Sequence, residues 1–316
     1  MSSTSSSNRT GEPQDLLPHL THDDMPALFL AADKESLRAQ SRFKILIGLN
    51  LILVLASAVL TSLKIDETFT PVIVSWPIDR NFTLLASAIF LSTGIILSGV
   101  VRFKKYDKIW YDGRAVAESV KTLTWKYVTR AQPYGSHLSP AELSHAFAID
   151  LASLLPSIKN YSIHHPGPLI TPKMAEIRAL PFDQRATIYL NDRVNGQSDW
   201  YSIKSLSNKR QNSWWFIALV LSQICAVVYS LVLIWHPTIH FNFVPLFTTV
   251  AASVISWTQV QKFQELAESY SVAAQELSLA SERGRYLESE DALSQFVDDS
   301  ETAVSREHTL WAARRK

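Results

Sequence analysis

Apolar side chains gather in four runs, and the sequence between the runs is polar. The runs cover residues 45–63, 82–101, 214–235 and 241–257, and none of them holds a charged side chain. A helix needs about 20 apolar residues to cross a hydrocarbon core about 30 Å thick. The runs follow one another as two pairs. The pattern therefore predicts an all-α integral membrane protein with two transmembrane helical hairpins and four spans.

Basic residues stand beside the outer ends of both predicted hairpins. The residues that flank the hairpins are Lys34, Arg38, Arg42, Lys44, Arg102, Lys104, Lys105 and Lys108 in the first half, and Lys204, Lys209, Arg210 and Lys262 in the second. Lys64 and Arg80 are the only basic residues in the connection within the first hairpin, and the turn 236–240 contains neither Lys nor Arg. Basic residues next to a span stay on the cytoplasmic side. Both termini are therefore expected in the cytoplasm.

Helical periodicity continues beyond the second and the fourth span. Residues 103–129 contain no proline. The apolar residues that recur at steps of three and four after the fourth span are Phe263, Leu266, Tyr270, Ala273 and Leu277. This spacing is typical of a seam between packed helices, so we expect each span to run on into a long cytoplasmic helical extension. The two extensions align without a gap at Lys105 and Lys262, which predicts an internal repeat.

Proline and serine content organises the rest of the chain. The stretch between the hairpins is rich in proline, which disrupts helix interiors, but Ser139-Pro140-Ala141-Glu142 predicts a helix start there, with the helix ending near Leu155. The segment from residue 289 is expected to fold back on 260–286. The predicted organisation is a disordered tail at 1–25, a first two-transmembrane unit at 26–131, a cytoplasmic connector at 132–181, and a second two-transmembrane unit with a C-terminal helical hairpin at 182–316.

Two sets of small or polar residues within the spans suggest functions there. Ala218, Ser222, Ala226 and Ser230 recur at every fourth position of the third span, which is typical of a helix-packing face. The fourth span places Asn242, Thr249, Ser253 and Ser256 on roughly one helical face. Two interpretations of this second set stay open: the residues pack against another helix, or they line a water-filled path through an oligomer.

Composition and charge narrow the function further. The net charge of +1 provides no surplus of cations for nucleic-acid phosphates. The chain has no Gly-rich phosphate loop, no Gly-x-Ser-x-Gly motif and one cysteine, Cys225. His19, His22, Asp23 and Asp24 have a spacing that suits a metal, but a disordered tail would not hold ligands in place. Glu307 and His308 near Trp311 lack a nucleophile. We expect a protein that is not an enzyme and has no cofactor, metal or nucleic-acid partner.

Several motifs resemble the SLATT superfamily of bacterial two-transmembrane proteins. The residues that carry the resemblance are Trp110, Arg114, Glu118, Lys121 and Trp125 after the first hairpin, Arg185 and Trp200 before the second, and Glu307, His308 and Trp311 near the end. The resemblance begins at about Ala32 and covers most of the chain as two units in tandem.

The resemblance implies a function. Family members are membrane effectors of prokaryotic conflict or anti-phage systems, in the bacterial inner (plasma) membrane, often encoded beside nucleotide-synthase or nucleotide-sensing proteins. It implies a homo-oligomer that forms a pore in the lipid bilayer and permeabilises it when triggered through its cytoplasmic helices. The alternative is a non-conducting membrane scaffold that docks a cytoplasmic partner.

Overall fold

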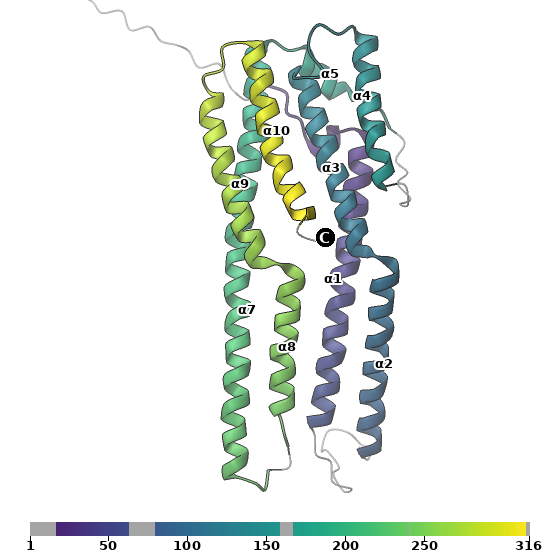
Figure 1. Ribbon diagram of the computed structural model, residues 1–316, viewed down its shortest axis with the longest axis vertical. Helices are drawn as coiled ribbons and strands as arrows, with labels where there is room; N and C mark the ends of the chain where they lie inside the picture. Colours follow the sequence, from purple (N-terminus) through teal and green to yellow (C-terminus); the bar gives the residue numbers. More distant parts are fainter. Residues whose placement is uncertain (1–16, 63–79, 159–166, 240, 314–316) are drawn as a thin grey trace, which may run out of the picture.

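The computed structural model describes residues 17–62, 80–158, 167–239 and 241–313, with the side chains of residues 80 and 305–313 left undescribed. Within these ranges all the regular elements are helices. The long helices run nearly parallel to the long axis of an elongated molecule (Figure 1). The described part of the chain is therefore all-helical, as its sequence predicts.

Each half of the chain is built on one long helix. In the first half α1 (Ala27–Ser62) packs against α2 (Arg80–Lys104) and α3 (Tyr106–Thr129). In the second half α7 (Gly196–Trp235) packs in the same way against α8 (Val244–Gln261) and α9 (Phe263–Gly284). The order of helices is thus repeated, in agreement with the predicted internal repeat.

Both units contain a helix break at the same aligned position. Lys105, between α2 and α3, has φ 49° and ψ 43°, and Lys262, between α8 and α9, has φ 54° and ψ 40°. This left-handed conformation is unfavourable for residues with a Cβ atom. The expectation that the spans continue unbroken into their extensions is wrong. Neither break is marked by proline or glycine, which are the usual signals in a sequence.

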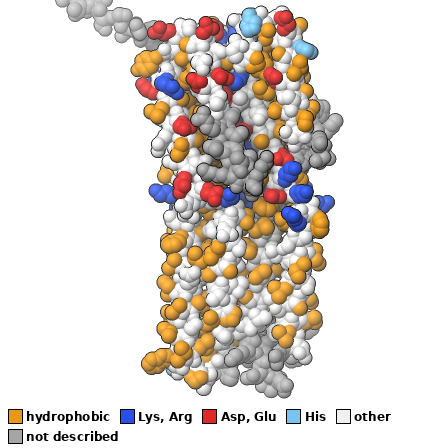
Figure 2. All heavy atoms as spheres, in the orientation of Figure 1, with side chains coloured by type: hydrophobic (Ala, Val, Ile, Leu, Met, Phe, Trp, Pro, Cys, Tyr) orange, Lys and Arg blue, Asp and Glu red, His pale blue; other side chains and the backbone are white. Residues whose placement is uncertain are grey.

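One half of the molecule is apolar. We call α2, α8, residues 45–62 of α1 and residues 211–235 of α7 the apolar half, and the remaining helices the charged half. On the face in Figure 2, charged side chains occupy the upper half, and Lys and Arg gather where the halves meet. Three helical stretches, Ala27–Ser62, Asn81–Thr129 and Phe182–Trp235, contain a segment long and apolar enough to cross a membrane. The 18-residue α8 is not among them.

The four apolar helices form an open row. Extensive contacts join α2 to α1, α1 to α8, and α8 to α7, so the order across the row is α2, α1, α8, α7 (Figure 1). Among the described residues α2 and α7, at the two ends of the row, have no extensive contact with each other. Large apolar side chains on the row, such as Ile95 and Phe216, are 73% and 62% exposed. This exposure suits lipid or further copies of the chain.

The charged half holds the main core. α3 lies at its centre, beside α1, α4 (Pro140–Leu154), α5 (Pro172–Ala179), α6 (Phe182–Ile188) and α10 (Glu290–Ala313). The predicted start of α4 is confirmed, since Ser139 accepts a hydrogen bond from the Glu142 amide. The predicted fold-back of α10 onto α9 is also confirmed, but α10 contacts α3 as well. It therefore joins the two units.

The segment before α1 corrects another prediction. Residues 17–25 fall within the predicted disordered tail, but here they are docked on the charged half. Leu20 and Met25 are buried, and the side chain of Asp24 accepts hydrogen bonds from the Thr21 amide and hydroxyl. Two buried apolar side chains and a local polar network are enough to fix this short segment. Residues 1–16 lie outside the described part.

Candidate functional site

The two units meet at a rare element, the π-helix η4 (Tyr189–Asn195) between α6 and α7. Such stretches occur frequently at functional sites. The side chains of Tyr189, Arg193 and Val194 in this element are buried. Asp192 accepts a hydrogen bond from the Leu20 amide at 3.0 Å, and its carboxylate lies 2.8 Å from Nδ1 of His19. The element therefore directs one face into the core and holds the N-terminal segment on the other.

Arg193 forms a buried ion pair with Glu301 of α10. Its Nε lies 2.8 Å from Glu301 Oε1 and its Nη2 lies 2.6 Å from Oε2, a bidentate arrangement. The two residues are 2% and 1% exposed. Burial lowers the pKa of Arg193, but the facing carboxylate outweighs this effect and the pKa rises. Arg193 is therefore charged in the core, and its charge depends on the facing Glu301.

Two hydroxyl groups complete the surroundings of the Glu301 carboxylate. Tyr189 donates to Oε1 at 3.2 Å, and Thr122 of α3 donates to Oε2 at 2.7 Å. Burial first, and then the Glu301 charge, raise the pKa of the Tyr189 hydroxyl, which stays a proton donor. We call Thr122, Tyr189, Arg193 and Glu301 the central lock, because it joins α3 of the first unit to η4 and α10 of the second.

A second layer of charges lies beside the central lock on α3 and α1. Arg114 contacts Glu118 at 2.8 Å and Asp33 at 3.3 Å. Lys121 lies 3.3 Å from His22. Burial and the nearby Arg193 lower the pKa of Lys121 to about 8, and burial and Lys121 lower the pKa of His22. This layer is therefore sensitive to pH near neutrality and above.

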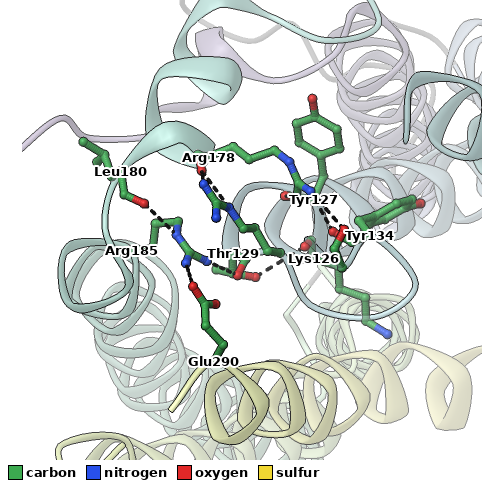
Figure 3. Close-up of polar contacts among 10 residues, drawn as sticks. Lys126, Tyr127, Thr129, Tyr134, Arg178, Leu180, Arg185 and Glu290 are labelled. Carbon is green, nitrogen blue, oxygen red and sulfur yellow. Dashed lines mark hydrogen bonds and ion pairs between the residues drawn. The ribbon is translucent and has the colours of Figure 1, made fainter. Parts of the chain in front are cut away.

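Arginine side chains cap the C-terminal end of α3 (Figure 3). Arg185 donates to the Thr129 carbonyl at 2.5 Å and to the Leu180 carbonyl at 3.0 Å, and it pairs with Glu290 of α10. The last carbonyls of a helix have no partner within it and carry partial negative charge. Arg185 satisfies one of them and ties the same helix end to α10.

A second arginine completes this cap. Arg178 donates to the Tyr127 carbonyl and, at 2.8 Å, to the Tyr134 carbonyl, while its guanidinium lies 4.9 Å from the Tyr127 ring centroid. Arg130 in turn donates to the Arg178 carbonyl at 3.0 and 2.8 Å. The connector is thereby bonded to α3 through its backbone as well as its side chains.

The structure places five of the ten predicted motif residues around these two networks. Arg114, Glu118 and Lys121 belong to the second layer, and Arg185 belongs to the cap. Trp125 is 1% exposed with its ring edge on Tyr189, and its Nε1 has no hydrogen-bond partner among the described residues. Trp110 and Trp200 lie further down, towards the apolar half. The side chains of Glu307, His308 and Trp311 lie outside the described part.

The sequence prediction missed the residues that matter most in this geometry. The sequence assigns no role to Arg193 or Arg178 and pairs neither of them with a partner. Glu301 is predicted to lie along the junction of the last helix, because it falls on the apolar face of α10 with Leu293, Val297 and Val304, but the sequence names no partner for it. A charge on such a face signals a buried partner.

The predicted sets in the spans lie as follows. Ser222 and Ala226 are buried, and Ala218 and Ser230 are half-buried, so this strip faces the row. In the other set Ser253 is buried and Ser256 is exposed. Asn242 precedes α8, and its side chain accepts a hydrogen bond from the Val244 amide, so it is not on the predicted helical face. Packing and pore-lining roles stay predictions.

The histidine clusters do not form a metal site in the described residues. No group of three or more His, Cys, Asp or Glu side chains is arranged to hold a metal there. His19 contacts Asp192 and His22 contacts Lys121, so the predicted spacing serves docking of the N-terminal segment. The pair His164 and His165 lies outside the described residues.

Comparison with known protein families divides the chain at η4. Residues 26–186 match SMODS and SLOG-associating 2TM effector domain 3, and residues 189–311 match SMODS and SLOG-associating 2TM effector domain 1. No curated protein and no solved structure matches the chain. The central lock thus takes Thr122 from the first domain and its other three residues from the second. The chain belongs to the SLATT family of two-transmembrane membrane effectors and carries two SLATT domains in tandem.

Proposed function

We propose that the protein is an effector of a prokaryotic conflict or anti-phage system that assembles into an oligomeric pore in the bacterial inner membrane. The apolar half spans the bilayer with four helices, and the charged half lies in the cytoplasm with both termini. The basic residues between the halves support this orientation. The family description supports the effector role.

The open row of helices carries the proposal of assembly. Only 17%, 11% and 6% of the most apolar windows of the three long stretches are buried within one chain. Polar contacts already link α1 to α2, where Ser57 and Ser87 hydroxyls lie 2.5 Å apart. A row of this kind can join the row of a second copy edge to edge without rearranging its own hairpins. Repetition of this step would close a ring of helices.

The central lock and the two helix breaks provide a route for triggering. α3 and α9 are tied to α10 in the charged half, and each is connected to its span through one left-handed residue, Lys105 or Lys262. A partner that moves α10 would shift both cytoplasmic helices, and the breaks would let the spans tilt separately. A few kcal/mol of differential binding is enough to shift such an equilibrium.

The partner of the charged half is proposed to be a nucleotide-synthase or nucleotide-sensing protein. The matched families are described as associating with SMODS and SLOG. The charged half offers a structured surface for such a protein. The trigger itself would then be a nucleotide signal, bound by the partner or passed on to this chain.

One observation favours the alternative of a non-conducting scaffold. The hydroxyls of Thr249 and Ser256 donate to the Pro245 and Ala252 carbonyls of their own helix at 2.7 and 2.9 Å. Serine and threonine that bond in this way need no water-filled path. In a scaffold the spans anchor the charged half, and the partner docks without any flow of ions.

Ion flux from liposomes that hold the full-length protein tests the two functions. The variant Glu301→Gln weakens the central lock and should raise potassium flux if the charged half keeps a pore closed. In that background Ser256→Leu, which replaces an exposed hydroxyl, should reduce the flux again. Leu221→Ala, on the exposed face of α7, is the control and should leave it unchanged. A Glu301→Gln protein that inserts and assembles but never conducts would favour the scaffold.

A further inference from the structure

A groove follows α1 through the charged half. It consists of two hollows of about 410 and 770 Å³, which adjoin because Asp23 and Leu30 line both of them. The smaller hollow lies between the start of α1 and the start of α5, where Met25 and Thr171 line it. The larger hollow extends along α1 as far as Arg42, close to the apolar half. We call the two hollows together the α1 groove.

The part of the α1 groove nearer the apolar half is basic. Its cations are Lys34, Arg38 and Arg42. The carboxylate of Asp33 in the same hollow already faces Arg114 of α3 at 3.3 Å. Arg38 meets Glu35 of its own helix at 3.7 Å in an exposed pair, which binds weakly. Leu37, between the cations, is 50% exposed. This part therefore suits an occupant that is both apolar and acidic.

The other end of the α1 groove, around the start of α5, is acidic. Lys173 pairs there with Glu176 at 2.7 Å, so their charges offset each other. The carboxylates of Asp23 and Asp24 add negative charge to the same hollow. The α1 groove thus changes from positive beside the apolar half to negative at its far end.

One exposed face of α9 carries the opposite order of charges. Helical steps of three and four place six exposed residues on this face: Glu265, Glu268, Val272, Glu276, Leu279 and Arg283. We call these six residues the α9 stripe. Its glutamates begin beside the apolar half, its arginine lies at the far end, and Val272 and Leu279 are 57% and 70% exposed. Figure 1 shows α9 at one edge of the molecule, where another chain can reach it.

The α9 stripe and the α1 groove also match in height above the apolar half. Arg38 lies seven residues before Ile45, and Glu268 lies seven residues after Gln261. Lys34 and Val272 are each eleven residues from the same two positions. Both helices rise about 1.5 Å per residue. Copies related by a symmetry axis along the membrane normal keep each residue at its own height, so these groups can meet between copies.

We propose that the α9 stripe of a second copy of the chain docks in the α1 groove, a proposal that rests on the membrane orientation and assembly proposed above. The two apolar side chains of the stripe cover Leu37 and its surroundings. The charges then pair along the contact as Arg42 with Glu265, Arg38 with Glu268, Lys34 with Glu276, and Asp23 with Arg283. Since two different surfaces meet, each docked copy leaves one of them free for the next copy, and repetition closes a ring.

Exchange of charges tests the pairing. The dissociation constant between copies of the full-length protein is measured in detergent by dilution, with mass photometry to count the copies. Glu268→Arg or Arg38→Glu alone sets like charges opposite each other and should raise this constant about fivefold. The double variant E268R/R38E should return to within about twofold of the wild type. Glu288→Arg reverses an exposed charge outside the α9 stripe, and as the control it should change the constant less than about twofold.

Cross-linking tests which chain occupies the α1 groove. In a Cys225→Ser background, Ser41→Cys and Glu265→Cys each lie four residues from the apolar half. When the two single variants are mixed, a short bismaleimide should join two copies, and neither variant should cross-link alone. Cross-linking of one variant to itself would overturn the proposal in favour of a symmetric contact. A cross-link within one chain that carries both cysteines would overturn it as well.

Ion flux from liposomes separates this contact from the proposed pore. Unchanged dissociation constants in Glu268→Arg and Arg38→Glu, or no recovery in E268R/R38E, would overturn the contact and leave the α1 groove to a protein partner. If such variants still conduct, the pore stands without the contact. Copies that show charge exchange and the expected cross-link but conduct no ions would support the contact and exclude the pore.

Discussion

The charged half and the apolar half join the two SLATT domains in different ways. In the charged half, α10 of the second domain lies against α3 of the first, with a bidentate ion pair of 2.8 and 2.6 Å at its centre. In the apolar half the domains meet through α1 and α8 alone among the extensive contacts. The molecule is therefore tightly joined at one end and loosely joined at the other.

The hairpins themselves are also held by different chemistry. In the first, hydroxyl and amide side chains bond across the helices, as Ser57 does with Ser87 and Asn50 with Ser98 at 3.3 Å. In the second, rings pack together, with Trp215 and Trp257 centroids 6.4 Å apart. Each hairpin thus has contacts of its own, and the α1–α8 contact joins the two hairpins.

Removing one member of the central lock should have the largest effect. Glu301→Leu leaves Arg193 charged and buried without a counter-charge, which costs about 3–5 kcal/mol of unfolding free energy. Arg193→Met combined with Glu301→Leu should recover more than half of this loss. Denaturant unfolding in detergent, followed through tryptophan fluorescence, measures both. Asp299→Asn, an exposed change on the same helix, is the control. Additive losses in the double variant would contradict a coupled pair.

Larger side chains at the packed face of α7 should destabilise the apolar half and leave the central lock intact. Ser222→Leu with Ala226→Leu inserts bulk where α7 faces the row, and overpacking typically costs about 1–3 kcal/mol. Cross-linking between α7 and α8 should fall while the fluorescence of buried Trp125 stays unchanged. The matched control is Ile224→Leu with Val228→Leu on the exposed face. A loss of Trp125 signal equal to that in Glu301→Leu would mean that the halves unfold together.

Removing the backbone strain at the two helix breaks should stabilise the protein slightly. Lys105→Gly and Lys262→Gly remove the Cβ atom from a left-handed residue, a gain of about 1 kcal/mol or less after the entropy of glycine is counted. Lys104→Gly and Gln261→Gly, at the last right-handed helical positions, should instead destabilise by about 1 kcal/mol. Thermal unfolding of the four variants checks the contrast. If all four behave alike, the breaks store no strain.

The smallest expected effect is a pH dependence in the second layer. Lys121 has a pKa of about 8 in the folded protein, against about 10.4 in an unfolded chain. Between these values the unfolded state binds more protons, so this residue makes stability rise with pH across that window. Lys121→Met should reduce the increase of unfolding free energy with pH. Its stabilising effect relative to the wild type should be largest below pH 8. Parallel profiles of unfolding free energy against pH would exclude this role.

The sequence predicts the apolar helices well, but it does not predict where each of them ends. Runs without charge identify the spans because lipid tolerates so few alternatives. The break at Lys105 could not be read in this way, since lysine carries no signal for a left-handed residue. The docked segment 17–25 was hidden for a similar reason, because its two buried apolar residues are too few to form a periodic pattern.

The charged half could be predicted in outline but not in its pairings. The helix cap at Ser139 and the apolar face of α9 depend on residues only three or four positions apart, so the sequence predicts both. The partners Arg193 and Glu301 are 108 residues apart, and nothing in the sequence selects one among the many possible arginine–carboxylate pairs. The resemblance to a family identified Arg114, Glu118 and Trp125 as important but not the ion pair beside them.

The position of α10 in the chain also sets an order for biosynthesis. Glu301 is synthesised after every other helix described here, so α1, α2, α7 and α8 all precede it from the ribosome. Until that moment Arg193 has no carboxylate, and the core between α3 and η4 stays incomplete. The charged half of a nascent chain therefore stays open, and only a chain translated through α10 can close it. A cell that stops translation early would leave incomplete products recognisable to its proteases by this exposed core.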